Sequence, residues 1–310
     1  MNKPVTIKTS SARETTAAPV ISELAIIVPA YNEAGAIRET IDTIKAMIAD
    51  AGLDAEIVIV DDGSTDGTCE TAEATGVRVI RNGENVGYGF SLKTGIAATK
   101  SEYVAIMDAD GTYPAGRLPD MLETCRTADM VVGNRGAAMK NVPWIRKPAK
   151  WILNTLANLL AQRNIPDLNS GLRVFKRSSL ERFVQLLPDG FSFTTTITLS
   201  MLCSNLRVVY TPITYGKRVG HSKIKARDFF TFILLVLRII VFFQPLRVFM
   251  PLGAGLFALG AGKAIYDIFK MNLSESAIFA LLAALMVWSL GLIADMIARL
   301  HLRPPPASGQ

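Results

Sequence analysis

Short apolar runs alternate with segments of helical periodicity through the first two thirds of the chain. Residues 24–28 are all apolar and predict a buried strand, and Ile37, Ile41, Ile44 and Ile48 then recur at the spacing of a helix face. Further strands are predicted at 56–60, 77–81, 103–107, 130–132 and 207–210, and in a run that ends at Lys176. Helices are predicted after Thr68, up to Ala98, near 117–126 and near 194–204.

Polar clusters follow each of the first four predicted strands. They are residues 29–33, 61–68, 85–95 and 108–111. Strands that alternate with helices predict a mostly parallel sheet, and such sheets bind ligands beyond the carboxyl ends of their strands. Chance could place one cluster at that edge, but four in succession indicate a binding site.

Asp108 and Asp110 come directly after the apolar run 103–107. Alternate residues of a strand point to the same side, so we expect the two carboxylates to project together. A divalent cation would relieve their repulsion, and a small set of hard oxygen ligands suits Mg²⁺ or Mn²⁺ that keeps positions for substrate phosphates. The simpler interpretation is a strand that runs into an Asp-rich turn.

Gly87, Gly89 and Gly95 form a glycine-rich stretch after the third predicted strand. Their spacing does not match the G-x-G-x-x-G fingerprint of dinucleotide-binding proteins, which also follows the first strand instead of the third. The glycines indicate a close approach of the backbone to a phosphate or to a neighbouring loop. Lys93 lies one helical turn further along and could reach the same place.

Composition and charge extend this picture to a membrane. Half of the 310 residues are hydrophobic and the mean hydropathy is +0.30, which predicts one large domain plus a part buried in lipid. The formal net charge of +6 favours an anionic partner, and a membrane surface, nucleotide phosphates and nucleic acid all remain open.

The cysteines and histidines exclude several kinds of site. The three cysteines, Cys69, Cys125 and Cys203, are widely spaced, which disfavours a disulfide framework or a structural zinc site and fits a reducing compartment. His221 and His301 are the only histidines, so the chain has almost no residues with which to build a Ser/His/Asp triad or a His-ligated metal site.

The two ends of the chain lie outside the predicted sheet domain. Residues 1–22 are rich in Thr, Ser and Ala and predict a disordered cytoplasmic leader. Residues 229–243 are strongly apolar, but the run is too short to span a bilayer and contains Arg238. We therefore predict an interfacial amphipathic helix within 226–245.

Two later segments, 248–269 and 277–297, are long enough to cross a bilayer. Basic residues flank the outer ends of this hairpin, which predicts a multi-pass protein with both termini and the sheet domain in the cytoplasm. These residues are Arg247, Arg299 and Arg303, and the tail 304–310 follows. Ala254, Ala258 and Gly262 form a small-residue stripe that indicates close helix packing, either within the hairpin or between protomers.

Three motifs, in this order, are highly specific together. They are Val28-Pro29-Ala30-Tyr31-Asn32-Glu33, Val60-Asp61-Asp62-Gly63-Ser64-Thr65-Asp66-Gly67-Thr68 and Asp108-Ala109-Asp110. The chain from 24 to 225 resembles the family 2 glycosyltransferases, and within them the polyprenyl-phosphate sugar transferases such as dolichyl-phosphate mannose synthase and its undecaprenyl-phosphate relatives. The resemblance implies an α/β fold, with a GT-A (Rossmann-like), mostly parallel sheet domain at 23–225, followed by interfacial helices and a two-helix transmembrane hairpin.

The same resemblance implies roles for individual residues. The donor nucleotide is expected at Pro29, Ala30, Tyr31, Glu33, Val60, Asp61, Asp62, Lys93 and Ala109. Asp108 and Asp110 would carry the metal on the sugar diphosphate, and Arg135 is similar to a family Arg near the sugar and phosphates. Mannose synthases often have a Gln near the position of Thr112, so a further side-chain metal ligand stays open. Asp167 is a candidate for local positioning.

The stretch 217–223, Lys-Arg-Val-Gly-His-Ser-Lys, resembles the basic segment with which these enzymes bind phosphate. Lys217, Arg218, Ser222 and Lys223 are therefore expected to bind the acceptor phosphate. Whether Lys217 or Arg218 fills the family's Arg role stays open. The stretch lies directly before the predicted interfacial helix, which favours phosphate capture at the membrane over a merely solvated run of charge.

The implied activity is that of an inverting glycosyltransferase of the inner membrane. It would use Mg²⁺ or Mn²⁺ to move a hexose from a nucleotide sugar, of UDP-glucose or GDP-mannose type, to a polyprenyl phosphate. Its partners would be these substrates, the lipid bilayer and a second copy of the chain, with no nucleic acid. Two alternatives stay open: a glycosyltransferase that acts on a hydroxyl acceptor and needs a positioned base, and a membrane protein that binds nucleotide sugars without turnover.

Overall fold

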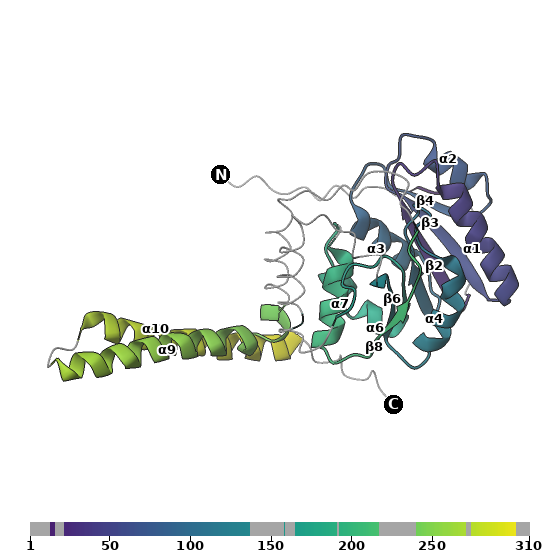
Figure 1. Cartoon of the computed structure of the whole chain (residues 1–310). Helices are drawn as coiled ribbons and strands as arrows, with labels where there is room; N and C mark the ends of the chain where they lie inside the picture. Colours follow the sequence, from purple (N-terminus) through teal and green to yellow (C-terminus); the bar gives the residue numbers. More distant parts are fainter. Residues whose placement is uncertain are drawn as a thin grey trace, which may run out of the picture. The chain divides into compact units, whose positions relative to one another are not determined.

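The computed structural model describes residues 13–15, 22–136, 158, 165–190, 192–216, 240–270 and 274–301. The chain forms two compact units. The first comprises residues up to 151 together with 164–226, and the second comprises 152–163 together with 227–310. The first unit contains a β-sheet with helices around it, and the second contains a long helical hairpin (Figure 1).

The described strands of the first unit form one sheet with the order β1-β4-β3-β2-β5-β7-β6-β8. They are β1 (Arg13–Thr15), β2 (Leu24–Ala30), β3 (Ala55–Asp61), β4 (Arg78–Arg81), β5 (Tyr103–Ile106), β6 (Met130–Asn134), β7 (Arg173–Lys176) and β8 (Val208–Pro212). Strands β4, β3, β2 and β5 pair in parallel, as do β6 and β8, whereas β1 and β7 are antiparallel to their neighbours. The carboxyl ends of six strands therefore meet at one edge, which confirms the predicted mostly parallel sheet.

Helices cover both faces of this sheet (Figure 1). They are α1 (Ile37–Ala51), α2 (Thr68–Glu73), α3 (Tyr88–Ala98), α4 (Leu118–Cys125), α6 (Arg177–Glu181) and α7 (Phe193–Cys203), with short 3₁₀ turns η1 (Ala115–Arg117) and η4 (Val184–Leu186). Leu24, Ile26 and Val28 of β2 share a buried cluster with α1, α2 and α4. Ile27 faces the opposite side, where α3 packs. This alternation along one strand explains why the apolar run is continuous: both of its faces are buried.

Strand β1 lies inside the segment 1–22 that we predict as a disordered leader. Arg13, Glu14 and Thr15 pair with the outer edge of β4, so for these three residues the prediction is wrong. An unpaired strand edge offers backbone donors and acceptors to any extended segment within reach, which a pattern of polar residues does not reveal. Apart from Ser22, the rest of the predicted leader lies outside the described residues.

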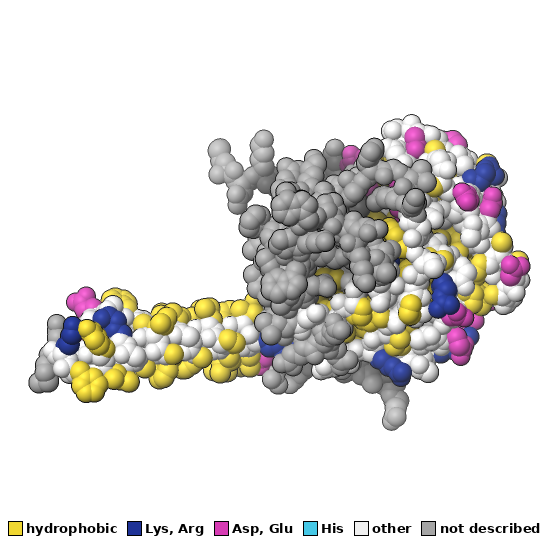
Figure 2. Space-filling model, viewed as in Figure 1, with side chains coloured by type: hydrophobic (Ala, Val, Ile, Leu, Met, Phe, Trp, Pro, Cys, Tyr) yellow, Lys and Arg dark blue, Asp and Glu magenta, His cyan; other side chains and the backbone are white. Residues whose placement is uncertain are grey.

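The second unit contains α9 (Leu246–Phe269) and α10 (Glu275–His301), which pack side by side (Figure 1). Both are long and apolar enough to cross a membrane, as predicted. Hydrophobic side chains cover the hairpin, and charged ones gather near its turn (Figure 2). The most exposed of the large apolar side chains are Leu259, Ile268, Phe269, Phe279, Met286 and Met296. Of the predicted interfacial helix, only 240–245 are described, and 240–243 are helical.

Glycines bring the two helices of the hairpin together. A Cβ on Gly253 would collide with the indole of Trp288, and one on Gly291 would lie 2.6 Å from Cβ of Phe249. The predicted stripe of Ala254, Ala258 and Gly262 is exposed instead, so packing of this stripe within the hairpin is the wrong alternative. Gly253 and Gly291 face the partner helix because a residue with a Cβ at either position would clash with Trp288 or Phe249.

Gly95 allows α3 to lie directly on the sheet. A Cβ at this position would sit 2.5 Å from Cγ2 of Ile27 and 3.1 Å from Cγ2 of Val60, both stiff branched side chains in buried strands. We predict that Gly95→Val destabilises the full chain by about 1–3 kcal/mol, because overpacking moves the helix off the sheet. Melting in detergent, followed by circular dichroism, measures this effect.

Gly116→Val is the matched control, since Gly116 is exposed and an added Cβ there meets no heavy atom within 4 Å. Equal melting temperatures for the two variants would contradict the packing account.

Candidate functional site

Loops from distant parts of the sequence meet at the carboxyl edge of the sheet. The loops after β2 and β3 are fastened to each other: Asn32 N–H donates to Ser64 Oγ (2.9 Å), and Thr65 N–H donates to Asn32 Oδ1 (2.9 Å). Glu33 N–H donates to Thr68 Oγ1 (2.8 Å). Asn32 has a φ of 55°, a left-handed conformation that Asn tolerates better than most residues. The hydroxyl groups of Ser64 and Thr68 therefore fix the conformation of the loop after β2.

Most of the predicted donor-site residues lie along this edge. Pro29 and Ala30 are buried at the end of β2, and the Ala30 carbonyl accepts from Asp62 N–H (2.8 Å). Val60 is buried on the α3 face of β3. The carbonyl of Ala109 accepts from Thr40 Oγ1 of α1 (3.1 Å). Tyr31 and Glu33 are half-buried in the loop after β2.

Asp61 and Asp62 are adjacent, but they have different surroundings. The Asp62 carboxylate accepts from Asn82 Nδ2 (2.9 Å) and from the N–H groups of Val86 (3.1 Å) and Gly87 (2.9 Å). Burial raises the pKa of Asp61, whose Oδ2 accepts from Ser64 N–H (3.2 Å). Asp62 thus fixes the loop that leads into α3, and its contact with a nucleoside stays a prediction.

The glycine-rich start of α3 lies against a neighbouring loop, residues 187–190. A Cβ on Gly87 would lie 2.5 Å from the Asp189 carbonyl oxygen, which also accepts from Phe90 N–H (3.0 Å). Lys93 forms an ion pair with Asp189 and donates to the Leu187 carbonyl (3.2 Å). Of the two roles considered for these glycines, the structure therefore shows the approach of a loop. Binding of the nucleotide by Lys93 stays a prediction.

Asp108 and Asp110 lie in the loop after β5, which ends at Ile106. The predicted pairing of the two aspartates rests on the alternation of side chains along a strand, and the strand ends before it reaches Asp108. Asp108 Oδ1 accepts from the hydroxyl of Tyr88, the first residue of α3 (2.9 Å). Asp110 is buried, and its Oδ1 accepts from Thr112 Oγ1 (2.6 Å) and Thr112 N–H (3.2 Å). A hydroxyl therefore orients each carboxylate.

Gly171, in the segment before β7, packs against the Asp108 carboxyl group. An added Cβ there would lie 2.7 Å from both Cγ and Oδ1 of Asp108. The Gly171 N–H donates to the hydroxyl of Tyr113 (2.7 Å). Burial and the negative charge of Asp108 raise the pKa of both Tyr88 and Tyr113, so both phenols stay neutral at physiological pH.

Arg135, which follows β6, is held by the side chain of Asp167. Its Nε and one terminal nitrogen donate to the two carboxylate oxygens (2.8 and 2.9 Å), and its N–H donates to Oδ2 (3.2 Å). The guanidinium also lies 5.4 Å from the centre of the Tyr215 ring, which packs edge-on against Tyr113. Burial raises the pKa of Asp167, but the hydrogen bonds and charge of Arg135 outweigh it, so the pKa lies below 3.8.

Arg173 is a fully buried cation that sequence reasoning did not single out. Its guanidinium donates to the carbonyls of Ser170 (2.8 Å) and Leu168 (2.9 Å) and to Thr198 Oγ1 of α7 (2.6 Å). It thereby supports the loop that carries Asp167 and Gly171. Tyr88, Thr112 and Gly171 were likewise not identified as neighbours of the two aspartates. Thr112 lies two residues after Asp110 in the sequence, whereas no local pattern marks Tyr88 or Gly171.

Gly216, the last described residue before the predicted acceptor segment, contacts the loop of the two aspartates. Gly216 N–H donates to the carbonyl of Thr112 (2.9 Å), and Lys217 is the next residue in the chain. Lys217, Arg218, Ser222 and Lys223 themselves lie outside the described residues, so their contacts stay predictions.

The two aspartates fit a metal that takes few ligands from the protein. Among the described residues, no three His, Cys, Asp or Glu side chains gather around one point. Mg²⁺ and Mn²⁺ are commonly bound by one or two carboxylates, with water and substrate phosphates in the remaining positions. Hydroxyl groups of Tyr88 and Thr112 donate to these carboxylates and orient their oxygens, and Gly171 packs against Asp108. Asp108 and Asp110 would hold such an ion.

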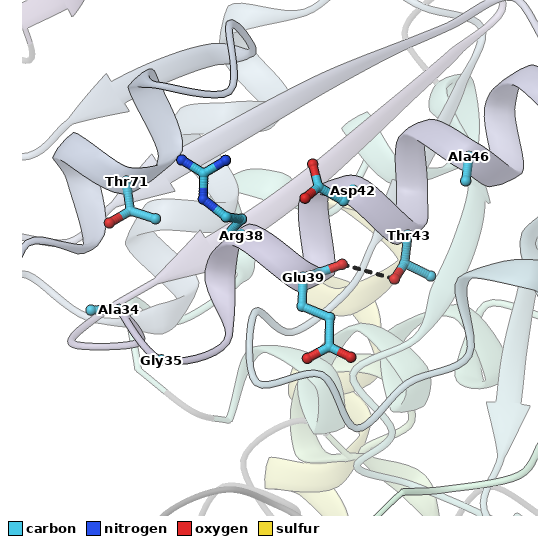
Figure 3. Close-up of a pocket in the computed structure, with 8 residues that line it drawn as sticks. All are labelled: Ala34, Gly35, Arg38, Glu39, Asp42, Thr43, Ala46 and Thr71. Atoms are coloured by element: carbon cyan, nitrogen blue, oxygen red, sulfur yellow. Dashed lines mark hydrogen bonds between the residues drawn. The ribbon is translucent and has the colours of Figure 1, made fainter.

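A shallow hollow of about 670 Å³ lies elsewhere, along the outer side of α1 (Figure 3). Residues of α1 and of the loop before it line most of it, together with Thr71 of α2. Arg38, Glu39 and Asp42 are among its lining residues, and none of the predicted site residues is. The convergence of predicted side chains, and not this hollow, therefore identifies the candidate site.

Comparisons with known proteins agree with this arrangement. Residues 25–184 match the model of glycosyl transferase family 2, and residues 244–300 match the GtrB C-terminal hairpin. The chain is 30% identical over 212 residues to an undecaprenyl-phosphate mannosyltransferase of Micrococcus luteus, which covers 64% of this chain and 85% of that protein. It is 30% identical over 209 residues to the low-salt glycan biosynthesis hexosyltransferase Agl6 of Haloferax volcanii, covering 66% of this chain but only half of that relative.

A solved structure also shares the fold. Glucosyl-3-phosphoglycerate synthase of Mycobacterium tuberculosis, in complex with Mn²⁺, UDP-glucose and phosphoglyceric acid, superposes with a TM-score of 0.55. The match covers 71% of this chain and 80% of that one at 22% identity. Together with the family match, it confirms the predicted GT-A fold. It also supports, in general terms, the use of a divalent metal by enzymes of this fold.

The buried pair of Arg135 and Asp167 generates a stability prediction. Asp167→Asn should lower the free energy of unfolding by about 3 kcal/mol at neutral pH, because the guanidinium loses its charge partner in a site where it is 13% exposed. Since folding lowers the pKa of Asp167, the wild-type advantage is complete above pH 3.8 and shrinks as the pH falls through the folded value. Urea unfolding of the full chain in detergent at several pH values measures both effects.

Glu181→Gln is the control, because Glu181 pairs with Arg177 while 59% exposed and its loss should change stability little. An Asp167→Asn effect as small as that of the control, or one independent of pH, would contradict a buried charge pair.

Proposed function

This chain belongs to glycosyl transferase family 2 and carries a GtrB C-terminal hairpin, and we propose that it transfers a hexose from a nucleotide sugar to a polyprenyl phosphate with inversion at the anomeric carbon. The donor would be of UDP-glucose or GDP-mannose type. A relative named for undecaprenyl phosphate supports the acceptor class. The Mn²⁺ and UDP-glucose of the solved structure support a metal-dependent nucleotide-sugar donor.

The hydrogen bond from Gly216 to Thr112 carries this proposal. It joins Gly216, the residue before the basic acceptor segment, to the loop of the two aspartates, only two residues beyond Asp110. Arg135 lies on the same side of the sheet, after β6, and its guanidinium contacts Tyr215, the residue before Gly216. These contacts support a site in which Arg135 and the basic segment after Gly216 would serve two anionic substrates, as phosphate attack on a sugar diphosphate requires.

The chemistry asks the protein mainly for positioning and charge neutralisation. The acceptor phosphate is an oxyanion at neutral pH, since its second pKa is about 6, and it needs no strong general base. Arg135, fixed by Asp167, would stabilise the phosphates of the donor, and Lys217, Arg218, Ser222 and Lys223 would align the acceptor for in-line attack. Bound Mg²⁺ or Mn²⁺ would neutralise the charge of the departing nucleoside diphosphate. A single in-line displacement inverts the sugar carbon.

The membrane supplies the acceptor in this proposal. The two apolar helices and the lipid-phosphate relative support a membrane protein. We place the sheet domain and both termini in the cytoplasm of a cell with an inner membrane, where nucleotide sugars are made. The exposed stripe of Ala254, Ala258 and Gly262 is available for packing between protomers of a homo-oligomer.

A transfer assay with a panel of sugar donors tests the activity. We predict that the purified full chain with Mn²⁺, undecaprenyl phosphate and a panel of UDP- and GDP-sugars releases nucleotide and forms a lipid product that loses its sugar in mild acid. Asp110→Asn should lower turnover by about 10²–10³-fold while the protein still folds, because charge on the leaving group is no longer neutralised. Asp120→Asn, on the exposed side of α4, is the control.

An acid-stable product would favour the hydroxyl-acceptor alternative. Tight binding of a nucleotide sugar without release of nucleotide would favour the binding-protein alternative. Full activity of Asp110→Asn would refute the metal assignment.

Lys223 tests the acceptor segment. Lys223→Ala should raise the KM for undecaprenyl phosphate about tenfold, the loss expected for one charge-assisted hydrogen bond, and leave the KM for the donor unchanged. Steady-state kinetics in mixed micelles, with acceptor and donor varied in turn, measures this split. Lys176→Ala, at the opposite edge of the sheet, is the matched control. An unchanged dependence on acceptor would refute the clamp.

A further inference from the structure

Tyr88 occupies a position that two parts of the fold fix independently. Its neighbour Gly87 donates its N–H to the Asp62 carboxylate (2.9 Å), and Phe90 N–H donates to the carbonyl of Asp189 (3.0 Å). Gly87 has a φ of 125°, which L side chains rarely adopt, so the chain turns sharply just before the helix begins. The start of α3 is therefore held on both sides, and the Tyr88 side chain projects from a rigid base.

The hydroxyl of Tyr88 reaches an element far away in the sequence. It donates to Asp108 Oδ1 at 2.9 Å, across 20 residues of chain. Gly171 closes the carboxyl group from another direction, with room for no Cβ. A carboxylate held between a phenol and a glycine backbone has little freedom to rotate, so the direction of its oxygens is set before any ligand arrives.

Asp110 is oriented in a different way. Two of its hydrogen bonds come from Thr112, two residues along the same loop, so these two form wherever that loop forms. The orientation of Asp108 depends instead on the docking of α3 and of the segment before β7. The two carboxylates can share one ion only if these separate elements are in place.

Resting on the metal role proposed for Asp108 and Asp110, we propose that Tyr88 is a positioning residue of the metal site. Through its hydrogen bond, Tyr88 holds the Asp108 carboxylate in the orientation that binds the ion. The hydrogen bonds of Asp62 hold Tyr88 in turn, so the second motif acts on the metal site through the start of α3. Loss of a partner that orients a metal ligand typically weakens metal affinity about 10–100-fold.

Mn²⁺ binding to the full chain in detergent, followed by electron paramagnetic resonance, tests this inference with the ion alone and with UDP or GDP added. Tyr88→Phe keeps the ring and removes only the hydroxyl. We expect its Mn²⁺ dissociation constant to rise about 10–100-fold, the KM for Mn²⁺ to rise with it, and kcat at saturating Mn²⁺ to recover most of the wild-type value. Melting should be nearly unchanged.

Two further variants provide a control and a second test of the orientation of Asp108. Tyr103→Phe, at the opposite end of the strand that leads to Asp108, is the matched control and should bind Mn²⁺ normally. Gly171→Ala should weaken Mn²⁺ binding with the Tyr88 hydroxyl intact, because its methyl group would displace the Asp108 carboxylate. Normal Mn²⁺ affinity of a folded Tyr88→Phe would overturn the inference, as would an affinity loss shared equally by Tyr103→Phe.

Metal binding separates this inference from the proposed transfer reaction. Mn²⁺ binding that Asp110→Asn abolishes establishes the site without any sugar being moved, so a negative transfer assay would refute the acceptor and leave the Tyr88 result standing. A wild-type chain that binds no Mn²⁺, alone or with nucleotide, would overturn the role of Tyr88 itself.

Discussion

The hydrogen bonds and close contacts that position the carboxylates of Asp108 and Asp110 are the constraint on which the candidate site depends. Both aspartates lie in the loop that follows the buried strand β5. A hydroxyl group donates to each carboxylate: Tyr88, from a helix on one face of the sheet, to Asp108, and Thr112, from the loop itself, to Asp110. The absence of a Cβ at Gly171 leaves space for one of the two groups. The orientation of the two carboxylates therefore depends on several elements of the fold.

The surrounding loops show the same dependence on distant partners. Hydroxyl and amide groups join the loops after β2 and β3, and Asp62 holds the turn into α3. Arg135 is kept in place by the fully buried side chain of Asp167. The polar residues at this edge thus serve two purposes, because many of them build the loops that present the others. A motif defined by substrate contacts in a family is also a motif of internal hydrogen bonds here.

The hairpin of the second unit follows a different physical rule. Its outward side chains are large and apolar, and glycines at the helix contact allow Trp288 and Phe249 to pack closely. In lipid the hydrophobic effect does not drive two helices together, so close van der Waals packing has to do so. One chain thus combines a family 2 sheet domain with a hairpin that is long and apolar enough to cross a membrane.

The sequence by itself determined the order of strands and helices, the mostly parallel sheet, the edge that carries the site and the two apolar helices. Periodicity and turn residues act locally, and apolar runs report burial directly, so these features could be read from the chain. Only the tertiary structure decided that Tyr88 and Gly171 meet Asp108, that Lys93 pairs with Asp189, that residues 13–15 add a strand to β4, and that Gly253 instead of Ala254 faces the partner helix. Each of these contacts joins residues far apart in sequence, and its geometry depends on how whole elements pack, which no local pattern encodes.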